Sequence, residues 1–171
     1  MNKGRRFDAK RIALCGVLLS LMLVLGWVEH MIPINAAIPG IKLGLSNGVL
    51  IFAVYMLDVP TSFVLMAMKV LLSCAFLGTP ASMMIYGFAG GVLSLTAMVL
   101  LSRVKGLHAV TVSMVGGVMH NVGQVAAAMI MLNTPNLLYY MAVLMVVGLG
   151  CGALTGVCAS LVMKHMRHMR F

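Results

Sequence analysis

Residues 12–28 of the chain read IALCGVLLSLMLVLGWV, an apolar run without a single charged side chain. A helix needs about 20 mostly apolar residues to cross the hydrocarbon core of a bilayer, and this run with its flanks reaches that length. Basic residues precede the run and further apolar runs follow it. We therefore predict a retained first transmembrane helix and not a cleaved signal peptide.

The same apolar character extends over the whole chain. Of its 171 residues, 62% are hydrophobic and 9% are charged, whereas an ordinary soluble domain is about 45–50% apolar. At about 20 residues per span, this length has room for six spans and little else. We expect residues 1–171 to form one integral membrane domain. The four cysteines lie in apolar segments without metal-ligand spacing, so they are interpreted as small packing residues with no metal or disulfide role.

Hydropathy breaks, together with Pro, Gly and charged residues, divide the chain into six predicted helices. Their approximate ranges are 11–31, 42–57, 61–77, 80–102, 108–132 and 136–163. The predicted fold class is an all-α polytopic membrane protein, a bundle of six transmembrane helices. An even number of spans puts both termini on one side of the membrane.

The distribution of basic residues tests this topology. The chain has 12 Lys and Arg against 3 Asp and Glu. The side carrying both termini receives Lys3, Arg5, Arg6, Lys10, Arg11, Arg103, Lys105, Lys164, Arg167 and Arg170. The other side receives only Lys42, and Lys69 lies within the third span. This asymmetry predicts cytoplasmic termini, and it also explains the basic tails without nucleic acid as a partner.

Small residues recur at a spacing of four along several predicted helices, as in Gly40/Gly44/Gly48, Gly87/Gly91, Gly148/Gly152/Gly156/Ser160 and Ala9/Ala13. In lipid, such stripes let helix backbones approach closely. Packing within the bundle explains most of them. Ala9 and Ala13 lie near the cytoplasmic edge, so we predict a contact with a partner protein there.

Ionisable groups at membrane depth usually face a bundle interior or a wet cavity. Glu29 ends the first span, Lys42 opens the second, and Lys69 lies near the middle of the third. Two interpretations are open for Glu29: it pairs with Lys69 or Lys42, or it extends to the outer interface as Lys42 does. A central Lys69 has no short route to water unless a cavity meets it.

The fifth span carries His120, Asn121 and Gln124, whose spacings of three and four form a polar patch about one turn long. Such a patch can join helices or contact a ligand. Ser46 and Asn47 begin the second helix, whose free N–H groups suit an anionic or carbonyl-bearing ligand. The predicted substrate-binding set is Glu29, Lys42, Ser46, Asn47, Lys69, His120, Asn121 and Gln124.

No enzyme constellation is recognised. Three acidic residues in the whole chain cannot supply the Asp-rich metal–diphosphate sites of prenyl transfer, and there is no P-loop, Ser-His-Asp or H-E-x-x-H arrangement. We expect a protein that is not an enzyme and that carries no catalytic residue, metal or cofactor.

Three stretches of the sequence carry a resemblance: IPGIKLGLSN at 38–47, YGFAGGVLS at 86–94, and HNVGQ at 120–124. They resemble the bacterial membrane family labelled heptaprenyl diphosphate synthase component I, also called the Gx transporter family. That family in turn resembles the substrate-binding S components of energy-coupling-factor (ECF) transporters. The resemblance implies six helices in the bacterial plasma membrane and an Ala-x-x-x-Ala, matched by Ala9 and Ala13, that contacts a transmembrane coupling (T) subunit.

The two labels imply different functions. The main hypothesis is an S-component-like subunit of an ECF-type importer, which captures a small amphipathic molecule while partner subunits hydrolyse ATP. The alternative is a non-catalytic membrane partner of isoprenoid or quinone (heptaprenyl diphosphate) synthesis, or of extracellular electron-transfer machinery. A channel is disfavoured because no span shows a polar stripe through its length.

Overall fold

The computed structural model describes residues 9–31, 42–78 and 80–166, and within these ranges every regular element is helical. The elements are α1 (Ala9–Met31), the 3₁₀ helix η2 (Leu45–Asn47), α2 (Gly48–Met56), α3 (Val59–Leu77), α4 (Ala81–Ser102), α5 (Ala109–Leu132) and α6 (Leu137–Met166). Five of them, α1 and α3 to α6, are long and apolar enough to cross a membrane. The predicted all-helical membrane protein is confirmed, with five of the predicted helices close to their expected bounds.

The second predicted helix is shorter than expected. Residues 42–44 are not helical, because Gly44 adopts a left-handed conformation (φ 86°) that a right-handed helix cannot include. Regular α-helix begins only at Gly48, and the apolar stretch Leu45–Met56 rises about 18 Å at 1.5 Å per residue, well short of a bilayer core of about 30 Å. Residues 42–57, predicted as the second transmembrane helix, therefore do not form a full transmembrane helix.

Turn chemistry sets the ends of the other helices. Pro60 lies in the first turn of α3, where its missing N–H is not needed, and Gly78 ends that helix in the left-handed conformation. Asn133 ends α5 in the same way with φ 48°. The predicted connection Pro33–Ile41 and the basic tails 1–8 and 167–171 lie outside the described residues.

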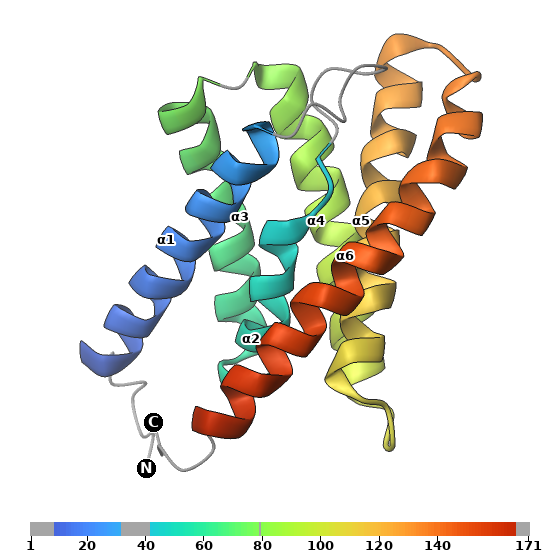
Figure 1. Cartoon of the computed structure of the whole chain (residues 1–171). Coiled ribbons are helices and arrows are strands. Elements are labelled where there is room, and N and C mark those ends of the chain that lie inside the picture. The colour runs from blue at the N-terminus through green and yellow to red at the C-terminus, as the bar shows by residue number, and fades with distance from the viewer. Residues whose placement is uncertain (1–8, 32–41, 79, 167–171) are drawn as a thin grey trace, which may run out of the picture.

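The short α2 lies at the centre of the bundle (Figure 1). Every residue from Ser46 to Ala53 is buried. Around α2 pack the apolar side chains of the main core, which include Met22 of α1, Met66 of α3 and Met98 of α4. The start of α1 and the end of α6 lie at the same end of the bundle (Figure 1), as the even number of predicted crossings requires.

The distribution of polarity is that of a protein solvated by lipid. Large apolar side chains are exposed on the outer helices, for example Val17 at 65%, Val146 at 72% and Leu161 at 62%. Polar side chains are instead buried in the interior, including Glu29, Asn47, Lys69, His120, Asn121 and Gln124. A soluble protein would show the opposite arrangement. Interior polar groups at this depth are expected to face a shared site.

Candidate functional site

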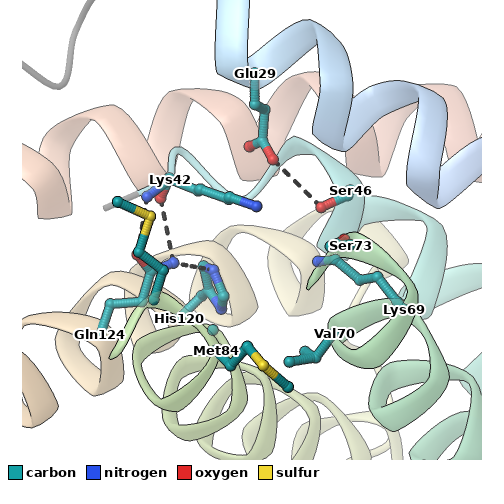
Figure 2. Close-up of a pocket in the computed structure, with 11 residues that line it drawn as sticks. Glu29, Lys42, Ser46, Lys69, Val70, Ser73, Met84, His120 and Gln124 are labelled. Atoms are coloured by element: carbon teal, nitrogen blue, oxygen red, sulfur yellow. Dashed lines mark hydrogen bonds between the residues drawn. The ribbon is translucent and has the colours of Figure 1, made fainter. Parts of the chain in front are cut away.

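A small cavity opens among α1, η2, α3, α4 and α5 (Figure 2). Its walls combine charged, polar and apolar groups: Glu29, Lys42, Ser46, Lys69, Val70, Ser73, Met83, Met84, Gly87, His120 and Gln124. The volume open to the centre of a water-sized sphere is about 30 Å³, enough for about two water molecules. The cavity is therefore where the interior polar groups of the bundle converge.

Glu29 enters the cavity from the last turns of α1 and is only 3% exposed. One carboxylate oxygen accepts a 2.5 Å hydrogen bond from the backbone N–H of Leu45, and the other accepts a 3.3 Å hydrogen bond from the Ser46 hydroxyl. The carboxylate thus satisfies a backbone donor at the start of η2. It is turned into the bundle and does not extend to the outer interface.

Both lysines of the cavity interact electrostatically with Glu29. Lys69, on α3 and 8% exposed, donates a 2.9 Å hydrogen bond from Nζ to the side-chain oxygen of Asn47. Lys42 is half-buried and lines the same cavity as that carboxylate. Glu29 therefore lies close enough to both ammonium groups to interact with their charges, and its own hydrogen bonds go to Leu45 and Ser46.

Gln124 fixes the non-helical segment at Lys42. Its side-chain oxygen accepts the Lys42 backbone N–H at 2.9 Å, and its amide nitrogen donates to the Lys42 carbonyl at 3.3 Å. These two bonds set the orientation of the amide, so its nitrogen also faces Nε2 of His120, which must accept. Irregular backbone at membrane depth is tolerated where its polar groups are satisfied in this way.

Two glycines allow this close packing. A Cβ at Gly44 would lie 2.9 Å from Cδ2 of His120, and one at Gly90 of α4 would lie 2.7 Å from the His120 carbonyl oxygen. Neither position has room for a side chain. The described residues 42–47 of the first stretch singled out in the sequence thus meet the other two, 86–94 and 120–124, at one place.

Six of the eight predicted substrate-binding residues line the cavity: Glu29, Lys42, Ser46, Lys69, His120 and Gln124. The other two lie behind it. Asn47 supports Lys69, and Asn121 points away from the cavity, donating a 2.6 Å hydrogen bond to the Leu144 carbonyl of α6. The side chain of Asn121 points in a different direction from that of His120, because successive residues of a helix are rotated by about 100°. Ala9 and Ala13, predicted to contact a partner, are exposed on α1.

The cavity also has members that sequence reasoning missed. Ser73 lies four residues after Lys69 on the same face of α3, a spacing that could have indicated it. Val70, Met83, Met84 and Gly87 form the apolar wall and carry no polar signal. Within residues 9–31, 42–78 and 80–166, no group of three His, Cys, Asp or Glu side chains could hold a metal ion. The site can bind a polar or charged group next to an apolar one.

Taken together, the fold and the site define an all-helical membrane protein with a polar cavity enclosed among five of its elements. Comparison with known families is consistent with this class. Residues 18–162 match the family described as heptaprenyl diphosphate synthase component I, and the chain belongs to that family. No curated protein and no solved structure matches the chain significantly.

Proposed function

We propose that this chain is a non-catalytic membrane component of heptaprenyl diphosphate synthesis, which holds a small amphipathic molecule in the cavity while a separate component carries out the chemistry. The family is described as component I of a synthase, which implies a second component as its partner. The observation that carries the binding role is the composition of the cavity wall. Charged groups from α1 and α3 face apolar side chains from α4, as a ligand with a polar head and an apolar body requires.

We further propose that the chain resides in the bacterial plasma membrane with both ends in the cytoplasm. The support is the excess of Lys and Arg on that side in the sequence, together with the position of the first and last helix ends at one end of the bundle (Figure 1). In this orientation the chain crosses the membrane six times, and the second crossing combines the irregular segment before η2 with the short α2.

A second candidate is the substrate-binding subunit of an ECF-type importer. One observation favours it: Ala9 and Ala13 are exposed near the start of α1. Their small side chains would let a helix of a coupling subunit approach the α1 backbone closely. In this case the partners would be a coupling subunit and ATPase subunits, and the cavity would hold the imported molecule.

Co-purification from native membranes separates the two candidates. With an affinity tag after Phe171, we expect a prenyl diphosphate synthase subunit to accompany the chain. Recovery of an ATPase with a coupling subunit would contradict the proposal and support the importer. Ala13→Leu is a useful variant, since it should remove a coupling subunit bound to α1. Val24→Leu, also exposed on α1, is its control.

A further inference from the structure

The carboxylate of Glu29 occupies a position built for an anion. It accepts hydrogen bonds from the Leu45 N–H and the Ser46 hydroxyl, and it interacts with the charges of Lys69 and Lys42. Backbone donors, a hydroxyl and two ammonium groups are the set of partners that proteins use for phosphate and carboxylate ligands. Figure 2 shows Glu29 of α1, Lys69 of α3 and Lys42, which precedes η2, around the same cavity.

The charges of this site do not balance. Two lysines face one carboxylate, and the other acidic residues of the chain are Asp8, outside the described residues, and Asp58, which pairs with Arg11 on the α1–α3 side. Lys69 is 92% removed from solvent, since its exposure is 8%, and a lysine carries three donors of which one is used by Asn47. A negatively charged ligand would balance the positive charge of the two lysines, whereas a cationic ligand would add to the excess of positive charge.

The cavity must widen before such a ligand can enter, because about 30 Å³ is far below the roughly 300–1,000 Å³ of ligand pockets. The element best able to move is α1. The most apolar stretch of α1 is 22% buried, as is that of α6, but α6 is joined to α5 by close backbone contacts at Gly148 and Gly152. A Cβ at Gly16 or at Gly26 would meet nothing within 4 Å, so α1 makes no close backbone contact at these positions.

We propose that the cavity binds the anionic head group of its ligand, and that this group competes with the Glu29 carboxylate for Lys69, Lys42 and the Ser46 hydroxyl. Displacement of Glu29 frees the end of α1 from η2 and opens the space that the apolar body of the ligand fills along Val70, Met83 and Met84. The inference rests on the proposed function for the class of ligand, an isoprenoid diphosphate. It adds the competition and the movement of α1.

Binding measurements in phosphatidylcholine nanodiscs test the competition, with farnesyl diphosphate, farnesol and inorganic diphosphate as probes. We expect farnesyl diphosphate to bind and farnesol to bind at least about tenfold more weakly, because farnesol has the chain without the charge. Glu29→Gln removes the competing charge but keeps an acceptor for the Leu45 N–H, so it should tighten farnesyl diphosphate binding about tenfold. Lys69→Met and Lys42→Met should each weaken that binding about tenfold.

The control is Lys105→Met, which removes an exposed lysine between α4 and α5 and should leave binding unchanged. Lys42 lies outside the long helices, so its variant remains informative if Lys69→Met fails to fold. Weaker binding by Glu29→Gln, or equal binding of farnesol and farnesyl diphosphate, would overturn the inference.

The movement of α1 has its own readout in Trp27, the one tryptophan of the chain, which is 53% exposed two residues before Glu29. Farnesyl diphosphate should shift the Trp27 emission of the wild type, and farnesol should not. An emission that stays constant while farnesyl diphosphate binds would contradict the displacement.

Nanodiscs containing phosphatidylglycerol separate two sources of the anion. If that lipid competes with farnesyl diphosphate, and Glu29→Gln strengthens the competition, a lipid head group uses the same site. That result supports the displacement of Glu29 while contradicting the isoprenoid part of the proposed function. Co-purification without a prenyl synthase would likewise contradict the proposed function and leave the competition standing.

Discussion

The pair α5–α6 and the helix α1 are held in the bundle by different means. Along α5–α6, glycines bring the two backbones together: a Cβ at Gly117 would lie 2.3 Å from the Gly148 carbonyl oxygen, and one at Gly152 would lie 2.6 Å from the Ser113 carbonyl oxygen. Along α1, neither Gly16 nor Gly26 meets a neighbour within 4 Å. Close backbone contacts at Gly148, Gly152 and Gly156 fix α6, whereas α1 depends on a few side chains.

Those side chains lie at the middle and at both ends of α1. Leu18 and Met22 reach the core, Glu29 binds η2, and Arg11 bonds Asp58 and Thr61. Without a strong hydrophobic drive between helices in lipid, close van der Waals packing and interhelical hydrogen bonds determine which helices stay together. The rigid and the movable parts of this bundle thus meet at the cavity, which Glu29 of α1 and His120 of α5 both line.

The largest expected effect comes from breaking the rigid part. Gly117→Ala places a methyl group against the Gly148 carbonyl oxygen, and backbone atoms cannot move aside as a side chain can. We expect a loss of at least about 3 kcal/mol in the free energy of unfolding, measured by denaturant titration in detergent. Gly150→Ala on α6 is the matched control, since its Cβ would meet nothing within 4 Å. Equal stability of the two variants would show that the close α5–α6 contact is unimportant.

The second effect concerns the end of α1 at the cavity. Glu29→Leu leaves the Leu45 N–H without its acceptor and two lysines without an opposing charge. We expect a loss of about 3 kcal/mol or slightly less in unfolding free energy, because unpaired buried donors and charges are costly. Glu29→Gln keeps a hydrogen-bond acceptor and should lose less than half as much unfolding free energy in the same denaturant titration. If Leu is tolerated as well as Gln, Glu29 does not hold α1.

A third effect tests the irregular segment between the two parts. Gly44→Ala combines a left-handed backbone with a contact to His120, and should cost about 2 kcal/mol. Gly106→Ala shares the positive φ, at +93°, but its Cβ would meet nothing within 4 Å. The difference between the two melting temperatures then reports the His120 contact alone, and no difference would contradict that contact.

The smallest effect is expected at the other end of α1. Arg11 and Asp58 are 39% and 35% exposed, and exposed ion pairs contribute only about 0–1 kcal/mol. Arg11→Gln should therefore lower stability by less than about 1 kcal/mol, and high salt should reduce the difference. Lys10→Gln, an exposed neighbour on α1, is the control for the loss of a positive charge. A loss as large as that of Glu29→Leu would place the main attachment of α1 at its first turns instead.

The apolar runs and the residues that end them predicted most of the fold. A long apolar run that ends at Gly, Asn or Pro has few alternatives to a helix in lipid. The exception is the second helix, which is predicted over residues 42–57 but whose first residues are not helical. Its non-helical start depends on Gly44, which is held in place by His120 and by the bonds of Gln124 to Lys42, about 80 residues further along the chain. Local sequence carries no record of such a contact.

From the sequence alone it follows that lipid is the solvent of this chain, that most of its helices lie where the apolar runs lie, and that Lys69 and His120 need an interior partner. These conclusions follow from transfer energies, which depend on each residue and its near neighbours. Only the tertiary structure decided that Glu29 lies between two lysines, that Asn121 turns away to α6, and that Ser73 and the methionines of α4 complete the wall. Those facts depend on how helices approach and rotate, which glycine contacts between distant segments set.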